Sequence, residues 1–472
     1  MVLPPVEWRR TGVSSPAMTR DASSPRVRIA DLVAATPDNR DRYVDFLRAA
    51  SIAVVMLGHW MMAVVARRNG AWELGNLLTY WSGAWLLTWA FQVMPVFFFV
   101  GGFSNKVTLD SLERRGAGYA EYASTRTWRL VKPVLVLLAI WLPLATIAQY
   151  AGVFDPAVLR QATTVVTQPL WFIGIYLIVT ALAPPMRALH QRFGARVLVA
   201  LVAGAIIVDV ARFVGEAAGI GYLNFGFVWL FAHQLGYFYA DGTLVRFPVR
   251  LLLPGALGGL VTLAMLTRLG PYPLSMVGLP GETVSNMNPP TICLIALTIW
   301  QASALILVRR PVTRWLQRSA AWGLVIAANS MIMTMFLWHL TSLMIAVLIL
   351  LPRGFPQPEV GTLAWWLLRP VWIAILCAVT ALFVLVLGRF ERPGRKTSDP
   401  SRGAGPTAAV GVTFVIVGVC GFAVSGLVDF VNPNGRQLIA LPVSPLINLA
   451  ALALGGLMFV FSRRRPAGPA PS

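Results

Sequence analysis

Arg48 and His59 are the first residues in this 472-residue chain whose types and spacing suggest chemistry. Both lie in the first long apolar run, where an ionisable side chain is costly and is therefore a functional-site hypothesis by default. The two residues are eleven positions apart. In a helix this is about three turns, so both project from one face, about 16 Å apart. Asp45 lies one turn before Arg48 and can pair with it, which predicts a helix with a charged foot and an imidazole deep inside.

One of the other histidines can lie close to the His59 imidazole. His59, His233 and His339 all fall within apolar runs, whereas His190 falls in a predicted loop. His59 and His339 lie on spans that run in the same direction, at similar depth, and an imidazole held in such a cavity can act as a general base. A structural interpretation stays open, in which His59 only bonds to a neighbouring helix. For His233 a hydrogen bond between helices is the preferred interpretation.

Arg126 and Arg129 have the spacing of one helix face. Two guanidinium groups at i and i+3 suit a phosphate or pyrophosphate. By spacing alone, an anchor at the cytoplasmic surface is the favoured interpretation of both arginines, and Arg48 shares this alternative. The chain has no Gly-x-Ser-x-Gly, no glycine-rich phosphate loop and no cluster of metal ligands, so serine-nucleophile and metal chemistry have no support in the sequence. Its three cysteines all lie in apolar runs and indicate neither disulfides nor a metal site.

Composition places these residues in a membrane protein. The chain is 57% hydrophobic and only 12% charged, whereas soluble domains carry about 25% charged residues. Apolar runs long enough to cross a bilayer recur along the whole chain, and this predicts an all-α, polytopic helical bundle. The alternating short strands of a transmembrane β-barrel are not seen in the sequence.

The net charge of +20 sets topology rather than indicating a nucleic-acid partner. Eight basic residues fall on one side of the predicted spans or at its membrane edge, namely Arg67, Arg68, Arg160, Arg212, Arg268, Arg353, Arg369 and Arg436. The other side carries the remaining 31 of the 39 lysines and arginines. By the positive-inside rule the basic side faces the cytoplasm, which places the protein in the inner (plasma) membrane with both termini cytoplasmic. Part of this charge also suits anionic lipid or a phosphorylated substrate.

Twelve spans are predicted, ten in a core and two near the C-terminus, and the chain divides into five segments. They are a disordered cytoplasmic tail (1–42), a ten-helix core (43–388), a cytoplasmic linker (389–408), a two-helix C-terminal membrane segment (409–462) and a short tail (463–472). Within the core, residues 105–130 are predicted as a basic inner loop, and the span 322–351 is longer than a bilayer requires, so it is tilted or broken. An outer loop over 268–288, rich in Pro, Gly, Asn and Ser, carries Glu282.

An ordered set of local motifs resembles the acyltransferase 3 family of integral membrane acyltransferases. The motifs are Tyr43-Val-Asp-Phe-Leu-Arg48 with His59 eleven residues after the arginine, Pro95-Val-Phe-Phe-Phe-Val-Gly-Gly-Phe103, Arg126-Thr-Trp-Arg129, Pro169-Leu-Trp-Phe172 and Phe336-Leu-Trp-His339. Each motif alone is weak, but their order is specific, and the resemblance covers about residues 43–388. The chain departs from members that carry a soluble esterase-like domain after the core, because it has two further helices instead.

The resemblance implies transfer of an acyl group from a cytoplasmic donor, usually acyl-CoA as co-substrate with no bound cofactor, to a hydroxyl. The acceptor would be a glycan, lipid or metabolite of the cell envelope or membrane, reached from the outer side. The family's first-helix histidine corresponds to His59, and its arginines correspond to Arg48, Arg126 and Arg129. Contacts between these arginines and donor phosphates are a hypothesis.

The mechanism that we expect uses His59 as general base on the acceptor hydroxyl or, as a less favoured alternative, as the residue that takes the acyl group. His339 orients His59 or receives a proton, Glu282 helps to hold the acceptor, and Asp45 and Trp171 support the site. The rival function is a transporter or lipid flippase, against which stand the motif order and the lack of a visible inverted repeat. A scaffold that binds without catalysis is a third alternative.

Overall fold

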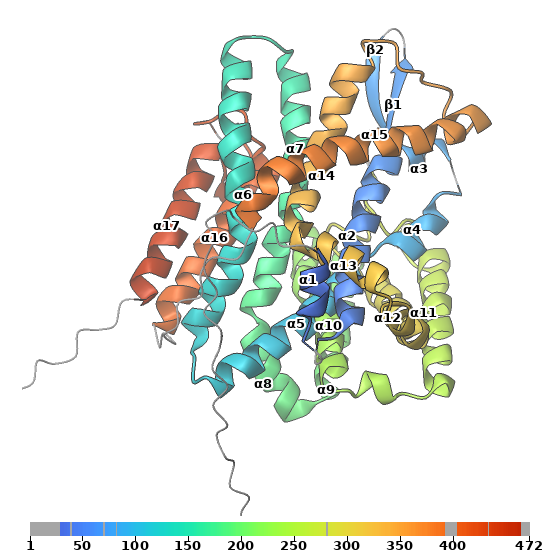
Figure 1. Cartoon of the computed structure of the whole chain (residues 1–472), viewed down its shortest axis with the longest axis vertical. Helices are drawn as coiled ribbons and strands as arrows, with labels where there is room; N and C mark the ends of the chain where they lie inside the picture. Colours follow the sequence, from blue (N-terminus) through green and yellow to red (C-terminus); the bar gives the residue numbers. More distant parts are fainter. Residues whose placement is uncertain are drawn as a thin grey trace, which may run out of the picture.

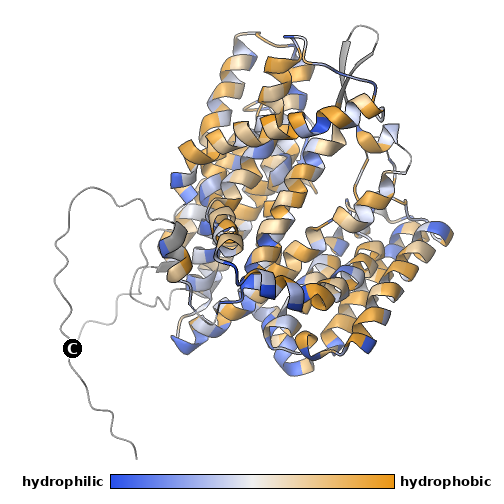
Figure 2. Cartoon of the chain, turned by 45° about the vertical axis from the view of Figure 1, so that its right-hand side comes forward, coloured by the Kyte–Doolittle hydropathy of each residue, from blue (hydrophilic) through white to orange (hydrophobic). Residues whose placement is uncertain are grey.

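The protein is described by a computed structural model, which covers residues 29–463 apart from 38–39, 69–70, 82, 280–281, 392–403 and 433. Its long helices pack side by side, and α15 crosses its neighbours at a steep angle (Figure 1). Hydrophobic residues dominate these helices, and hydrophilic residues gather at helix ends and in connections (Figure 2). The predicted all-α membrane bundle is therefore confirmed.

The elements follow one another in a single order along the chain. The first half contains α1 (Ile29–Ala34), α2 (Arg42–Met62), β1 (Ala63–Arg68), β2 (Ala71–Asn76), α3 (Leu77–Tyr80), α4 (Trp85–Phe91), α5 (Met94–Arg114), α6 (Tyr119–Tyr150), α7 (Pro156–Ala181), α8 (Ala183–Phe193), α9 (Arg196–Phe213), η1 (Ala218–Leu223) and α10 (Asn224–Ala240). The second half contains η2 (Leu244–Arg246), α11 (Val249–Leu269), α12 (Ile292–Trp315), α13 (Ser319–Ser330), α14 (Ile332–Leu350), α15 (Leu363–Leu387), η3 (Gly388–Glu391), α16 (Gly405–Ser425), β3 (Gln437–Leu438), β4 (Leu441–Pro442) and α17 (Pro445–Arg463).

The number of spans is lower than the twelve expected. Over the described ranges, ten helices are long and apolar enough to cross a membrane, or eleven if α8 and α9, bent by 119°, form one span. The predicted span over 224–240 does form a helix, α10, with the predicted bounds. It has only 17 residues, whereas about 20 are needed to cross a typical bilayer core. The protein is thus a multi-pass membrane protein with about ten spans.

Two predicted loops are largely regular structure. In the stretch predicted as a basic loop, α5 continues to Arg114 and α6 begins at Tyr119, so Arg126 and Arg129 lie on a helix. The short outer loop expected after the first span contains the antiparallel hairpin of β1 and β2. Polar residues at the ends of a long helix hide its true length from a hydropathy pattern, because they lie beyond the apolar segment.

The long predicted span 322–351 was expected to be either tilted or broken, and in the structure it is broken. Helix α13 ends at Ser330 and α14 begins at Ile332, with Met331 between them in a non-helical conformation (φ −132°, ψ 17°). The carboxylate of Glu391 accepts hydrogen bonds from the Met333 and Thr334 amides at the start of α14. These amides have no partner within the helix, so an acidic side chain from η3 fixes where α14 begins.

Part of the segment expected as a disordered tail is folded. Residues Ile29–Ala34 form α1, which packs on α13. Val33 contacts the cluster around Trp322, and the Trp322 indole N–H donates to Thr36. The tail before residue 29 and the last tail after 463 lie outside the described residues, as does most of the predicted linker. The predicted C-terminal pair of helices is present as α16 and α17, and α16 packs against α7 and α6 of the core.

Two glycines allow α5 and α10 to cross closely. A Cβ atom on Gly102 would overlap the backbone carbonyl of His233, and one on Gly236 would overlap the carbonyl of Phe99. Small residues at such crossings allow membrane helices to gain van der Waals contact that the lipid does not compete with. This crossing fixes α5, which carries residues of the candidate site, against the buried helix α10.

We expect Gly102→Val to lower the midpoint of thermal unfolding, because the added side chain forces α5 and α10 apart. Overpacking of this kind typically costs about 1–3 kcal/mol. The measurement is thermal unfolding of the purified protein in detergent, with Gly258→Val as control. Gly258 is also within a helix, but a Cβ there meets no atom within 4 Å. Equal unfolding midpoints for the two variants would contradict the close-crossing interpretation.

Candidate active site

Helix α2 carries the charged foot and the imidazole that its sequence predicts. Asp41 caps the helix by accepting hydrogen bonds from the amides of Tyr43 and Val44. The helix is continuous through Met62, so Arg48 and His59 lie on one element about three turns apart. Asp45 accepts a hydrogen bond from Arg48 Nη1 at 2.9 Å, which confirms the predicted pair. Arg40 donates to the other carboxylate oxygen of Asp45 at 2.6 Å.

His59 and His339 meet inside the bundle. His59 Nδ1 lies 2.7 Å from His339 Nε2, and the rings are nearly parallel, with an interplanar angle of 7°. His339 is fully buried, whereas His59 is partly exposed. The second ring nitrogen of His339, Nδ1, lies 2.5 Å from the carbonyl oxygen of Phe336. The expectation that the two histidines lie at similar depth is therefore confirmed.

These contacts determine which ring nitrogens carry protons when both rings are neutral. A carbonyl oxygen only accepts, so His339 Nδ1 must carry the proton that it donates to Phe336. His339 Nε2 is then an acceptor, and His59 Nδ1 donates to it. This leaves His59 Nε2 unprotonated, and it has no hydrogen-bond partner among the described residues. The arrangement produces an imidazole with a free lone pair, as a general base requires.

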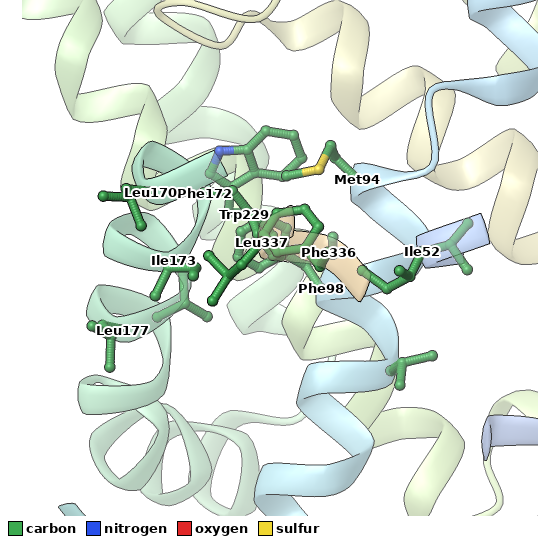
Figure 3. Packing of buried hydrophobic residues seen from close by; sticks show 14 of the residues in the cluster. Ile52, Met94, Phe98, Leu170, Phe172, Ile173, Leu177, Trp229, Phe336 and Leu337 are labelled. Atoms are coloured by element: carbon green, nitrogen blue, oxygen red, sulfur yellow. The ribbon is translucent and has the colours of Figure 1, made fainter. Parts of the chain in front are cut away.

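The rings of Phe336 and Trp60 lie next to His339, and Phe336 in turn packs on aromatic side chains of α7 and α5. The ring of Phe336 lies 5.4 Å from that of Phe172 on α7, and Phe172 also contacts Phe97 and Phe98 of α5 (Figure 3). On the other side, the indole N–H of Trp60 donates to the backbone carbonyl of His339 at 3.0 Å. The aromatic motifs singled out in the sequence thus converge on the helix turn that orients His339.

Trp171 takes a less direct position than its neighbour Phe172. It is partly buried, and its ring makes an edge contact with Phe172 at 6.3 Å. Phe172, rather than Trp171, therefore makes the contact with Phe336. A supporting role for Trp171 in the site stays a prediction.

Two of the three predicted arginines, Arg48 and Arg126, converge on Ser104 of α5. Arg48 Nη2 donates to the Ser104 hydroxyl at 2.7 Å, and Arg126 Nη2 donates to the Ser104 carbonyl at 2.6 Å. Arg126 also donates to the Thr108 hydroxyl, so its guanidinium joins α6 to α5. Arg129 is exposed, and no hydrogen bond joins it to another described residue. It lies close enough to Arg48 for their charges to interact. Of the three, Arg129 has the most donors available for a ligand.

Glu282 is not brought to the histidine pair by any contact among the described residues. It is exposed, and its carboxylate accepts a hydrogen bond from the amide of Leu279 in its own loop. Partial burial raises the pKa of the Glu282 carboxyl above its ordinary value. The loop itself is held at Met276 by Thr88 and Gln92. A role for Glu282 in holding the acceptor stays a prediction.

A cavity of about 280 Å³ opens where α2 begins. The ends of α10 and α12 lie here, since Arg309 donates to the Tyr239 hydroxyl, and that hydroxyl donates to Asp41. We call this region, defined by Asp41, Tyr239 and Arg309, the basic end of the site. The lining residues are Asp41, Phe103, Tyr239, Ala240, Gly242, Val245, Arg246 and Arg309. Sequence reasoning missed this cavity, because its wall comes from four separate elements and the connection before η2.

Metal ligation finds no support in the geometry of the described residues. They include no group of three or more His, Cys, Asp or Glu side chains that could hold a metal ion. His339 Nδ1 is bonded to the backbone carbonyl of Phe336, so the histidine pair keeps one ring nitrogen, His59 Nε2, free for proton transfer.

Comparison with known proteins identifies the core. A family model described as an acyltransferase domain matches residues 41–389, and a domain of unknown function, DUF4383, matches residues 406–469. No curated protein and no solved structure matches the chain. The first match covers most of the chain and includes α2, α5, α6, α7 and α14, which carry the candidate site. The chain therefore belongs to the acyltransferase 3 family, membrane-bound O-acyltransferases that transfer acyl groups other than amino-acyl groups.

Proposed function

We propose that this enzyme takes an acyl group from acyl-CoA at the basic end, in the cytoplasm, and transfers it to a hydroxyl of an acceptor that enters from the opposite side. The acceptor is a glycan, lipid or metabolite of the cell envelope or the membrane. The observation that carries the proposal is the hydrogen bond between His59 and His339, which leaves His59 Nε2 unprotonated.

The reaction requires a base that accepts a proton and returns it. In our proposal, His59 Nε2 removes the proton of the acceptor hydroxyl as its oxygen attacks the thioester carbonyl. A C–O bond forms and the C–S bond breaks, and the protonated His59 then gives the proton to the departing thiolate. His339 stabilises the imidazolium by accepting its Nδ1–H, and the Phe336 carbonyl holds the His339 ring in the tautomer that can accept.

The basic end has the chemistry that the donor's nucleotide requires. Its cavity combines Arg246 and Arg309 with the rings of Phe103 and Tyr239. Guanidinium groups suit phosphates, and aromatic rings suit a purine. Phe103 is next to Ser104, at which Arg48 and Arg126 converge, so the cavity adjoins the predicted phosphate-binding arginines. His59 lies eighteen residues along α2 from Asp41, about 27 Å in a helix, so the donor's pantetheine arm would extend along α2.

The orientation that we propose for the protein in the membrane depends on where its basic residues lie. The basic end is formed by α2, α10 and α12, and the last turn of α12 contains Arg314. Helices α5 and α8 also end in basic residues, Arg114 and Arg192. Lysine and arginine are retained on the cytoplasmic side of membrane proteins, so we assign this end to the cytoplasm and the membrane to the inner (plasma) membrane.

We expect Arg129→Gln to weaken donor binding, because Arg129 has no competing hydrogen bond in the described structure. Loss of one hydrogen bond to a charged group costs about 1.5–3 kcal/mol, which corresponds to roughly a 10- to 150-fold rise in Kd. The measurement is acetyl-CoA binding to the purified protein by calorimetry. Arg114→Gln, an exposed arginine at the end of α5, is the control. Unchanged affinity in Arg129→Gln would remove this arginine from the donor site.

Acyl transfer itself is tested with acetyl-CoA labelled in its acetyl group. The purified enzyme is mixed with an extract of the host cell envelope as a source of acceptors, and label in hydroxylated products is measured. The proposal predicts labelled ester and release of an equal amount of CoA. Transport of an unmodified lipid or solute without donor consumption would instead support the rival function.

A further inference from the structure

Arg369 is a buried cation near the start of α15. Its side chain is only 6% exposed. It lies six residues into a helix long and apolar enough to cross a membrane. Sequence reasoning placed this residue at the outer membrane edge, where a long side chain ordinarily extends its charged head into water. The low exposure shows that most of the side chain, including Nε, is instead covered by protein.

The guanidinium has no charged partner in the part of the chain that the structure describes. Arg369 forms no ion pair and donates no hydrogen bond there, and its Nε atom is buried without a partner. Its one specific contact is with Trp365, whose ring lies 4.2 Å from the guanidinium carbon. Glu359, the nearest acidic residue in the sequence, is exposed and forms no ion pair with it. A second buried donor, the indole N–H of Trp372, is also unpartnered.

This arrangement differs from that of Arg48 in the candidate active site. Arg48 is compensated by Asp45 and bonded to Ser104. Buried charges in proteins are ordinarily paired, because removing an ion from water carries a large desolvation cost. Stacking on an indole offsets only part of this cost. An arginine that is almost fully covered and has no anion among the described side chains is therefore a candidate for binding one.

The position of Arg369 relates it to the histidine pair. Arg369 lines a cavity of about 10 Å³ together with Ala63, Leu351, Gln357 and Trp372. The amide of Ala63 donates to the carbonyl of His59, so the cavity begins one helical turn beyond His59. It lies away from the basic end, beside the hairpin of β1 and β2 and the connection between α14 and α15. A volume of about 10 Å³ is near the lower limit for one water, so the cavity accommodates a single oxygen atom at the tip of a group rather than a whole substrate.

We propose that Arg369 binds an anionic oxygen group, a carboxylate or phosphate, that belongs to the acceptor. One oxygen of such a group would enter the cavity, where the guanidinium of Arg369 and the indole N–H of Trp372 are both donors. The bound anion holds the acceptor hydroxyl toward His59 from the end opposite to the donor. This inference rests on the proposed function, since it assigns a chemical class to the acceptor of that same site.

Thermal unfolding of the full-length protein in discs of neutral phosphatidylcholine tests the proposal without acyl transfer. The probes are inorganic phosphate and acetate, titrated at constant ionic strength against chloride. We expect both anions to raise the unfolding midpoint of the wild type and to act on Arg369→Gln with at least tenfold lower affinity. Without added anion, Arg369→Gln should unfold at the wild-type temperature or above it, because the uncompensated charge is gone. Arg353→Gln, at an exposed arginine that follows α14, should respond as the wild type does.

Three outcomes would overturn the proposal. A lower midpoint for Arg369→Gln with no anion response in the wild type would show a structural role for this arginine. An equal response in wild type and Arg369→Gln would place the anion elsewhere. A response that appears only when the discs contain phosphatidylglycerol would assign the cavity to a lipid headgroup rather than to the acceptor. Failure of the proposed function is separate, because it appears as no labelled ester and no release of CoA by the wild-type enzyme, and it leaves the anion response unchanged.

Discussion

His59→Ala is expected to lower the rate of acyl transfer from acetyl-CoA by roughly one hundred- to ten-thousand-fold, the usual contribution of a positioned general base. The reason is geometric. His59 Nε2 is the ring nitrogen of the histidine pair that keeps a free lone pair, since the other three ring nitrogens are engaged with one another or with Phe336. Alanine removes that lone pair. His339 Nε2, which then loses its donor, lies on the buried side of the missing ring and not where His59 Nε2 was.

The His59→Ala measurement uses initial rates of label transfer from acetyl-CoA to the envelope extract. Donor binding is measured in parallel and is expected to be unchanged, because His59 lies far along α2 from the basic end. His190→Asn is the control, since His190 is bonded to Asp241 and Gln234 and contacts neither His59 nor His339 in the described structure. Full activity in His59→Ala would reject the general-base assignment.

His339→Ala is expected to reduce kcat by roughly one hundred-fold while it changes the KM for the donor little. His339 holds the tautomer of His59 and accepts its Nδ1–H when the ring becomes charged, so its loss affects the transition state more than substrate binding. Partners that orient a catalytic or metal-bound imidazole commonly contribute about ten- to one hundred-fold. The measurement is kcat and KM from initial rates at varied acetyl-CoA.

A conservative variant separates positioning from packing at His339. Glutamine offers a carbonyl oxygen that can accept the His59 Nδ1–H, so His339→Gln should recover part of the lost kcat. His339→Leu fills a comparable volume without an acceptor and should behave like alanine. Equal kcat values for His339→Gln and His339→Leu would show that His339 acts only by filling space.

The sequence predicted the site helix well because its information is local. Asp45, Arg48 and His59 lie within fifteen residues of one helix, and helix geometry alone places them on one side. Their pairing and depth are confirmed. The contact with His339, 280 residues away, was also anticipated, because both spans run in the same direction and both histidines lie past the middle of their spans. A hydropathy pattern indicates how far along its span, and so how deep in the membrane, a residue lies.

Other features could not be predicted because they depend on contacts between distant elements. The Phe336 carbonyl that fixes the histidine tautomers is a backbone group, so no residue type indicates it. Ser104, at which two arginines converge, is an ordinary serine within an apolar helix. Arg369 lies in the sequence where a snorkelling arginine is expected, and only the packing of Trp365 and Trp372 around it shows its burial. Helix length was underestimated at α6, since polar residues precede its apolar part.

The most direct test of the central claim is a structure of the enzyme with a non-hydrolysable thioether analogue of acetyl-CoA. The account predicts that the nucleotide lies at the basic end, against Arg246, Arg309 and Arg129, with the pantetheine arm along α2. The analogue's acetyl carbonyl carbon would then lie beside His59 Nε2, with room for a hydroxyl between them. An analogue bound with its acetyl group away from His59, or with no passage from the basic end to that imidazole, would contradict the account.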